Sequence, residues 1–201
     1  MNRIIDGVRL FQQSVFPELM DLFGGLARGQ HPRALFITCS DSRVVPDLIT
    51  QSEPGELFVL RNPGNFVPPP GSRCEGVEAT VEYALSILKV EHVIVCGHSD
   101  CGAMKALLDP QDVSDYPILT AWLRHATDVR RFVEQESHRH ADPHQLLSIA
   151  IEQNVVRQLD NLRTYPCVAS AAVQLHGWVY DIETGEVFAY RPGEERFVPL
   201  T

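Results

Sequence analysis

The stretch that decides the predicted fold is residues 92–102, with the sequence HVIVCGHSDCG. Its first part, 92–96, is a short apolar run rich in branched side chains, which is typical of a buried strand. Gly97 and Gly102 then bound a polar turn that holds His98 and Cys101. We therefore predict a buried strand that delivers an imidazole and a thiol at its C-terminal end.

Two similar runs lie upstream of this strand. Residues 34–38 are apolar, as a buried parallel strand requires, and Cys39 follows directly. Residues 57–60 form another run, after the turn signal Glu53-Pro54-Gly55. Residues 61–71 contain two proline-glycine steps, which interrupt regular structure and predict a constrained loop.

Helical periodicity fills the intervals between these runs. Apolar residues at steps of three or four predict the following helices: 4–15, ended near Pro17, 20–26, 77–88, 119–132 and 147–162. Segment 137–144 is polar and predicts a loop. Near the C-terminus the chain alternates through Tyr180, turns at Thr184-Gly185 and returns through Val187, which is the pattern of a hairpin.

Strands that alternate with helices indicate an α/β fold, here a mainly parallel β-sheet flanked by helices, with an antiparallel edge hairpin. The 201 residues suit one domain, 1–201, in which 1–28 form an N-terminal helical arm. Parallel sheets place ligand sites beyond the C-terminal ends of their strands. We therefore expect Cys39, His98 and Cys101 at one rim, although 59 positions separate Cys39 from His98.

The charge and composition exclude several classes of function. The formal net charge of −9 disfavours nucleic acid and anionic membrane surfaces as partners, because both require a basic face. Residues 1–10 lack a secretory apolar segment, and no later run is long enough to span a bilayer. We expect a cytoplasmic protein. Five cysteines, an odd number, argue against a disulfide framework.

Cys39, His98 and Cys101 are of the residue types that bind zinc. Catalytic zinc sites use three protein ligands and keep a fourth position for water. The His98-x-x-Cys101 spacing by itself is equally compatible with an incidental turn histidine beside a core cysteine. A zinc site therefore needs support from elsewhere in the sequence.

The segment 39–43, with the sequence CSDSR, supplies that support. It places a thiol, a carboxylate and a guanidinium on alternate residues immediately after a strand, so Cys39, Asp41 and Arg43 can project towards one site. The alternative for Asp41 and Arg43 is an exposed ion pair, which contributes about 0 to 1 kcal/mol.

Several motifs together resemble the β-class carbonic anhydrases. The resemblance runs from the N-terminal helix to residues 176–180, and it looks closest to the bacterial branch that includes cyanase-associated and carboxysomal members. It is carried by the segments 39–43 (CSDSR), 53–56 (EPGE), 61–62 (RN), 82–84 (EYA), 97–102 (GHSDCG) and 176–180 (HGWVY).

The resemblance implies an activity and a set of site residues. The implied reaction is the zinc-dependent reversible hydration of carbon dioxide to bicarbonate and a proton by zinc-bound hydroxide, with one Zn²⁺ per subunit. Cys39, His98 and Cys101 are the implied zinc ligands. Asp41 and Arg43 are the implied catalytic pair, in which Arg43 keeps Asp41 ionised and Asp41 orients the hydroxide.

Further implications concern the substrate pocket and the assembly. Gln30, Phe58 and Tyr83 are implied to surround carbon dioxide, with part of that wall supplied by a second subunit. For Phe58 and Tyr83, ordinary core packing is an equally good explanation. The resemblance also implies a homodimer or homotetramer, located in the cytoplasm or in a carboxysome.

Two residues depart from the family's pattern. Pro63 follows Arg61-Asn62 where relatives carry a small or branched apolar residue, which leaves the width of the pocket open. Phe36 stands where regulated members carry a tryptophan that helps to hold a non-catalytic bicarbonate. We therefore expect that inhibitory site to be absent.

Two rival functions stay open on the sequence. Relatives of this fold hydrolyse carbon disulfide or carbonyl sulfide, and the metal motifs do not exclude those substrates. A zinc-stabilised scaffolding subunit is the non-enzyme alternative. The intact Asp41 and Arg43 argue against a purely structural site.

Overall fold

The computed structural model describes residues 1–139 and 142–200. The chain divides into two compact units, Met1–His31 and Pro32–Thr201. The predicted arm, 1–28, falls within the first unit. No helix of the described residues is both long and apolar enough to cross a membrane.

The first unit is a succession of short helices: α1 (Asn2–Leu10), the π-helical turn η1 (Phe11–Val15), α2 (Phe16–Glu18) and α3 (Met20–Leu26). Pro17 does not end the helical run as predicted, because the π-helical turn η1 continues directly into α2, which contains Pro17. The break comes at Leu19, whose backbone is not helical. None of the described residues in these four helices is buried.

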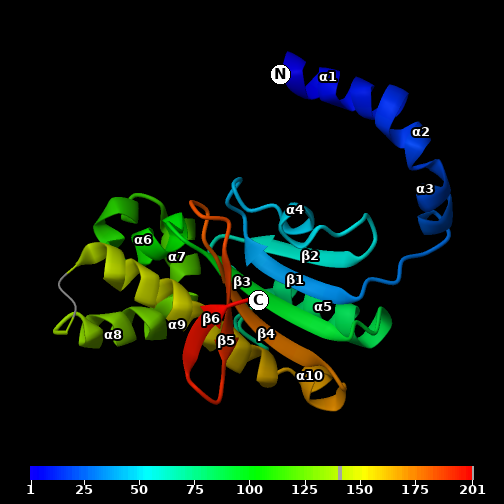
Figure 1. Ribbon diagram of the computed structural model, residues 1–201. Helices are drawn as coiled ribbons and strands as arrows, with labels where there is room; N and C mark the ends of the chain where they lie inside the picture. The colour runs from blue at the N-terminus through cyan, green and yellow to red at the C-terminus, as the bar shows by residue number, and fades with distance from the viewer. Residues whose placement is uncertain (140–141, 201) are drawn as a thin grey trace. The chain divides into compact units, whose positions relative to one another are not determined.

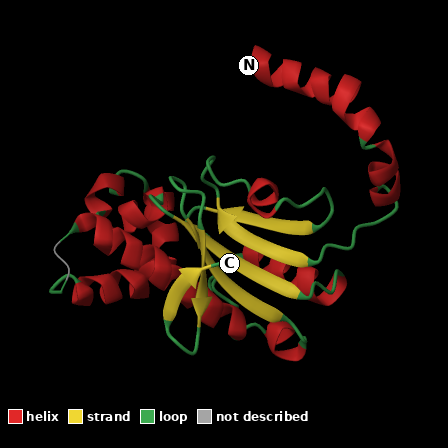
Figure 2. Ribbon diagram, viewed as in Figure 1, coloured by secondary structure: helices red, strands yellow, loops and turns green. Residues whose placement is uncertain are grey.

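The second unit is built on one sheet (Figure 2). In the described part of the chain its six strands lie in the order β2-β1-β3-β4-β5-β6. The first four are parallel, and β5 and β6 are antiparallel additions at one edge, so the predicted sheet and edge hairpin are confirmed. The strands are β1 (Ala34–Cys39), β2 (Leu57–Asn62), β3 (His92–His98), β4 (Gln174–Tyr180), β5 (Val187–Arg191) and β6 (Arg196–Pro199).

The register of the parallel strands brings distant residues to one rim. Cys39 lies opposite Asn62, the last residue of β2, and Thr38 lies opposite Cys96 of β3. Because His98 ends β3, the chain leaves these strands at the same edge of the sheet. The loops that follow β1, β2 and β3 therefore meet there, as the parallel arrangement predicts.

The helices of the second unit are α4 (Pro46–Thr50), α5 (Glu75–Glu82), η2 (Tyr83–Ile87), α6 (Gly102–Leu108), η3 (Pro110–Val113), α7 (Pro117–Leu123), η4 (Arg124–Ala126), α8 (Thr127–Glu136), α9 (Pro143–Arg163) and α10 (Pro166–Ser170). Helices α5, η2, α9 and α10 pack in the core on one face of the sheet (Figure 1). Helix α9 lies against β3 and β4, and a Cβ at Gly177 of β4 would come within 2.9 Å of Leu159 and Val155.

Two predicted segments differ in detail from the structure. The single helix predicted over 119–132 is two helices, α7 and α8, joined by the 3₁₀ turn η4. The predicted loop 137–144 is shorter, because α9 already begins at Pro143 with the Asp142 side chain as its N-cap. Within that loop, His140 and Ala141 lie outside the described residues.

Candidate metal centre

Cys39 ends β1 with its side chain almost fully buried. The backbone N–H of Gly64, from the loop after β2, donates a hydrogen bond to Cys39 Sγ at 3.4 Å. Hydrogen bonds from the Cys101 thiol and from this N–H lower the pKa of Cys39 to about 4, against the opposing effect of burial. These hydrogen bonds favour the thiolate form of Cys39.

His98 ends β3 and is completely buried. Its Nδ1–H donates to the carbonyl of Ser99 at 2.8 Å, which leaves the lone pair of Nε2 available. Nε2 is buried and has no hydrogen-bond partner among the described residues. A buried nitrogen in this state is expected where the structure is organised to bind another atom.

Cys101 is the N-cap residue of α6 and is also buried. Its pKa is raised because its thiol hydrogen-bonds to the neighbouring Cys39 thiolate and because it is buried. The two cysteines therefore titrate as a pair, in which Cys39 is the one favoured as thiolate.

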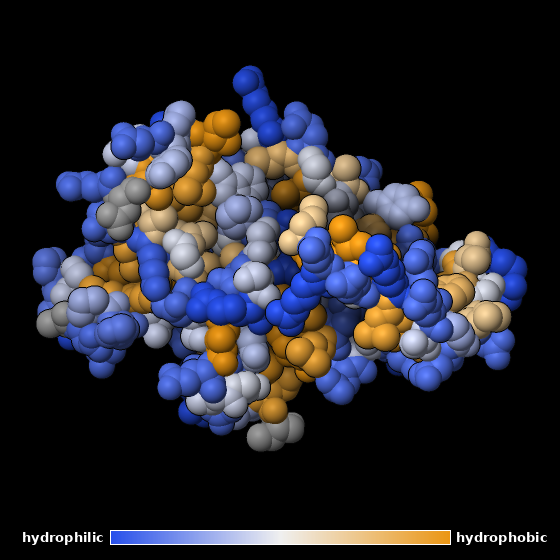
Figure 3. Space-filling model, turned by 90° about the horizontal axis from the view of Figure 1, so that it is seen from above, coloured by the Kyte–Doolittle hydropathy of each residue, from blue (hydrophilic) through white to orange (hydrophobic). Residues whose placement is uncertain are grey.

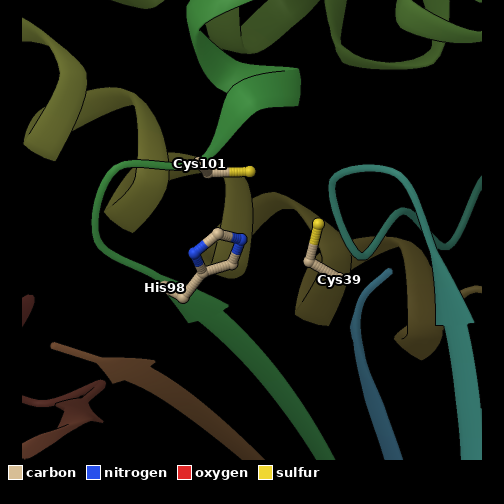
Figure 4. Close-up of side chains that lie close together, drawn as sticks. All are labelled: Cys39, His98 and Cys101. Carbon is tan, nitrogen blue, oxygen red and sulfur yellow. The ribbon is translucent and has the colours of Figure 1, made fainter. Parts of the chain in front are cut away.

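The three side chains converge on one point (Figure 4). Cys39 Sγ, Cys101 Sγ and a ring nitrogen of His98 all lie within 4.8 Å of one another, and the described residues contain no other such cluster of three or more cysteine, histidine or acidic side chains. In Figure 4 the His98 ring and both sulfur atoms face a common space. Two thiolates and one imidazole suit zinc, and three ligands leave a fourth position for a water molecule.

Asp41 and Arg43 form a close pair beside this cluster. Arg43 Nε donates to Asp41 Oδ1 at 2.9 Å and Arg43 Nη2 donates to Oδ2 at 2.7 Å, so the pair is bidentate. The Arg43 guanidinium holds the pKa of the Asp41 carboxyl well below its usual range. Asp41 Oδ2 also lies 3.9 Å from His98 Nε2, which places the carboxylate at the edge of the cluster.

Asp100 is a site residue that the sequence reasoning did not single out. Its carboxylate accepts a hydrogen bond from Arg43 Nη1 at 3.1 Å and forms an ion pair with Lys105. Asp100 has a φ of 60°, a left-handed conformation that aspartate tolerates better than most residues. The signal in the sequence was an aspartate within the turn 97–102.

Arg61 and Asn62 shape the rim through the backbone. Arg61 donates to the carbonyl of Cys39 at 3.1 Å and to that of Asp41 at 2.7 Å. The Asn62 side chain accepts from the N–H of Phe66 at 2.7 Å and donates to its carbonyl at 2.9 Å. Arg61 therefore holds the segment after β1, and Asn62 closes the loop after β2.

Two of the three expected substrate-pocket residues, Phe58 and Tyr83, do not join the cluster within this chain. Phe58 and Tyr83 pack against each other, with ring centroids 5.8 Å apart. Phe58 lies opposite Leu35, four residues before the rim, a separation of about 13 Å along a strand. Gln30 is exposed and belongs to the first unit, Met1–His31.

The two departures from the family's pattern have clear positions. Phe36 is buried in β1 and packs edge-to-face on Trp178 of β4, with centroids 6.1 Å apart. Pro63 accepts a hydrogen bond from Trp122 Nε1 at 2.7 Å through its carbonyl. Its ring lines an apolar groove of about 540 Å³, together with residues that include Ile118 and Trp122 but none of the three ligands.

Comparison with known proteins decides the family. The family model described as carbonic anhydrase matches residues 34–187, which include the whole cluster. The chain belongs to the carbonic anhydrase family. It is 50% identical to a carbonic anhydrase of Pseudomonas aeruginosa, over 100% of this chain and 92% of that protein. It is 48% identical to a carbonic anhydrase of Synechococcus elongatus, over 93% of this chain and 70% of that protein.

Solved structures place this carbonic anhydrase in the β class. The β-carbonic anhydrase CcaA superposes with a TM-score of 0.96 at 46% sequence identity, covering 100% of this chain and 92% of that one. The chain is therefore a zinc enzyme that interconverts carbon dioxide and bicarbonate, and the predicted bacterial β-class resemblance is confirmed.

Proposed function

We propose that Cys39, His98 and Cys101 hold the zinc ion of this carbonic anhydrase. The observation that carries the assignment is the buried Nε2 of His98, which has no hydrogen-bond partner among the described residues and faces two thiols. When bound, zinc supplies Lewis acidity, which makes a water molecule in its fourth position acidic enough to lose a proton. The hydrogen bond from His98 Nδ1–H to the backbone carbonyl of Ser99 fixes the ring, so that Nε2 can serve as the ligand.

We further propose that Asp41 orients the oxygen nucleophile. Each carboxylate oxygen has two acceptor positions. Oδ1 accepts from the backbone N–H and Nε of Arg43, whereas among the described residues Oδ2 accepts only from Nη2, so Oδ2 keeps one position free. Arg43 keeps the carboxylate ionised. An ionised Oδ2 can accept a hydrogen bond from the O–H of the nucleophile, which directs the nucleophile's lone pair at carbon dioxide.

The overall reaction needs only water and a place for the proton. Water adds across one C=O bond of carbon dioxide, and bicarbonate and a proton leave. Asp41 is a poor store for that proton, because Arg43 holds its pKa well below the usual range. Its role is therefore orientation, and the proton passes to solvent or buffer.

The oligomer is the next part of the proposal. Phe58 and Tyr83 lie away from the cluster of their own chain, so we infer that the carbon dioxide pocket takes Gln30, Phe58 or Tyr83 from a second subunit. One similar solved structure is described as a tetrameric β-carbonic anhydrase from Sordaria macrospora, with 31% identity and a TM-score of 0.76 over 94% of this chain. A homodimer or homotetramer fits that description.

Exposed apolar side chains support an assembly. The predicted stripe of the arm, Ile4, Val8, Phe11 and Val15, is exposed in the single chain. Figure 3 shows apolar residues, in orange, gathered at several places on the face that it draws. Exposed apolar surface of this kind marks interaction sites. We propose that residues 1–201 act as one catalytic domain with 1–28 as its arm, in the cytoplasm or in a carboxysome-like assembly.

Stopped-flow hydration of carbon dioxide by the purified protein tests the proposal. We expect one zinc per chain by elemental analysis and loss of hydration after chelation. Carbonyl sulfide hydrolysis is measured in parallel, and turnover of carbonyl sulfide without hydration of carbon dioxide would refute the assignment. Sedimentation checks the assembly, since a fully active monomer at assay concentration would refute the shared pocket.

A further inference from the structure

One backbone N–H connects the loop after β2 to the metal cluster. This loop, residues 62–68, is called the Gly64 loop below. The N–H of Gly64 donates to Cys39 Sγ at 3.4 Å. Gly64 has a φ of +84°, and a Cβ at this position would come within 2.8 Å of the Phe66 ring. The position of the donor therefore depends on how the peptide units on each side of Gly64 are held.

Trp122 holds the peptide unit before Gly64. The N–H that bonds to Cys39 shares a planar peptide unit with the carbonyl of Pro63. That carbonyl accepts a hydrogen bond from Trp122 Nε1 at 2.7 Å. The Trp122 ring packs on Phe66, with centroids 5.5 Å apart. Since the peptide unit is rigid, fixing its oxygen also fixes the direction of its N–H, and hydrogen bonds in such a chain strengthen one another.

Asn154 holds the peptide unit after Gly64. Its Nδ2 donates to the carbonyl of Gly64 at 2.9 Å, and its own Oδ1 accepts from Gln158 Nε2 at 2.8 Å. Gln158 Oε1 in turn accepts from the N–H of Val67 at 2.8 Å. Asn154 is only 1% exposed, on a face of α9 that otherwise packs in the core. Buried amides are unfavourable unless they are hydrogen-bonded, so Asn154 and Gln158 depend on the backbone groups of the Gly64 loop for their hydrogen bonds.

We propose that Trp122 and Asn154 are positioning residues for the zinc ligand Cys39. They hold the two peptide units of Gly64 so that its N–H stays on Cys39 Sγ. This inference rests on the proposed function, in which Cys39 binds zinc. The N–H···S bond fixes the direction of the sulfur and withdraws part of its negative charge, and outer groups of this kind change metal affinity by about 10- to 100-fold.

Zinc transfer from the loaded enzyme to a chromogenic chelator tests the proposal. Trp122→Phe removes the N–H donor but keeps an aromatic ring on Phe66. We expect zinc to leave this variant about 10-fold faster than it leaves the wild type. In the cobalt-substituted protein, the thiolate-to-cobalt charge-transfer band should shift, because the sulfur has lost a correctly aligned donor. If Trp122→Phe transferred zinc at the wild-type rate and its thiolate-to-cobalt band were unchanged, the proposal would be overturned.

Asn154→Leu is the second variant. It removes the donor to the Gly64 carbonyl and keeps the same branched arrangement of side-chain heavy atoms. We expect faster zinc transfer and a shifted charge-transfer band, as for Trp122→Phe. Circular dichroism and thermal unfolding establish which variants are folded. If Asn154→Leu does not fold, the result for Trp122→Phe decides the proposal.

Tyr165→Phe is the matched control. The buried Tyr165 hydroxyl donates to the carbonyl of Pro68 at 2.7 Å, at the other end of the same loop. Its loss should leave the transfer rate within about 2-fold of wild type, and an effect as large as that of Trp122→Phe would overturn the proposal in favour of general loosening of the loop. Wild-type protein without zinc, or Cys39→Ser with full zinc, would instead refute the proposed function.

Discussion

Cys39 and Cys96 are buried on neighbouring strands, yet their thiols are opposite in character. Cys39 is 5% exposed and its pKa is lowered to about 4. Cys96 is 0% exposed and its pKa is raised to about 12, mainly by burial. Cys39 receives hydrogen bonds from Cys101 and Gly64, whereas the Cys96 thiol lies among apolar side chains and donates to the carbonyl of Gly97 at 3.4 Å.

The difference shows that position along a strand decides what a buried thiol can do. Within a strand, the neighbouring N–H groups are mostly committed to the sheet, and the hydrogen bonds that Cys96 receives from Thr38 and Tyr180 do not offset the effect of burial on its pKa. At the end of a strand, loops bring N–H groups and other side chains that are free of the sheet. Cys39 is at such an end, and Cys96 is two residues short of it.

Replacing each cysteine with serine gives the largest expected contrast. Cys39→Ser should lose zinc and lower hydration activity by roughly 1,000-fold, because a neutral hydroxyl cannot replace a thiolate ligand. Cys96→Ser should keep its zinc and lose about 1 to 2 kcal/mol of unfolding free energy by placing a hydroxyl among apolar groups. Elemental analysis, stopped-flow assays and denaturant unfolding measure these effects. Full zinc in Cys39→Ser would break the comparison.

Removal of Arg43 is expected to have the next largest effect. Arg43→Ala should lower kcat/KM by roughly 100-fold, because Asp41 loses its bidentate partner and becomes free to bind the metal. Arg163→Ala is the matched control, since Arg163 pairs with Asp160 on the surface of α9. It should change activity by less than about 2-fold. Equal losses in the two variants would show that Asp41 and Arg43 act only as a surface pair.

The pH dependence of the loaded enzyme should follow the charge of its ligands. Two thiolates and a neutral imidazole cancel the charge of Zn²⁺, so the metal acidifies water less than in a three-histidine site. The lowered pKa of Asp41 keeps it ionised across the neutral range, so it adds no step there. We expect kcat/KM to rise about 10-fold between about pH 7 and 8.5. A profile already flat at about pH 6.5 in a non-coordinating buffer would contradict this.

A thiolate titration of the zinc-free protein is the smallest expected signal. A lowered pKa means that Cys39 is ionised above about pH 4 and protonated below it. The ultraviolet absorbance of one thiolate should therefore appear on raising the pH through that value. The step should be absent in Cys39→Ser and unchanged in Cys96→Ser, because Cys96 ionises only near pH 12. A first step in the ordinary thiol range would remove the distinction between the two cysteines.

The sheet and the metal cluster could be predicted because their signals are local. Short apolar runs mark β1, after Pro32, and β3, up to Gly97, and parallel pairing then requires Cys39 and His98 to meet at one rim. The four-residue strand β6 carries no comparable pattern and was not predicted. The break at Arg124–Ala126 was missed because the apolar spacing runs across it.

The residues behind the cluster could not be predicted for a different reason. Asn154 and Gln158 are polar residues on the buried side of a helix, and the sequence does not show that their partners are backbone groups about 90 residues away. Asp100 was likewise visible only as part of a turn. The proposed roles of Gln30, Phe58 and Tyr83 depend on a second chain, which no pattern within one chain describes.

Pairing of β1 with β3 leads us to expect a particular order of events during folding. Thr38 and Cys96, which lie opposite each other, are 58 residues apart in the chain, so their pairing closes a long loop at considerable entropic expense. Cys39 reaches His98 and Cys101 only after that closure. An ion that needs all three ligands stabilises interactions that form late. Zinc should therefore slow the unfolding of this enzyme while leaving its folding rate nearly unchanged.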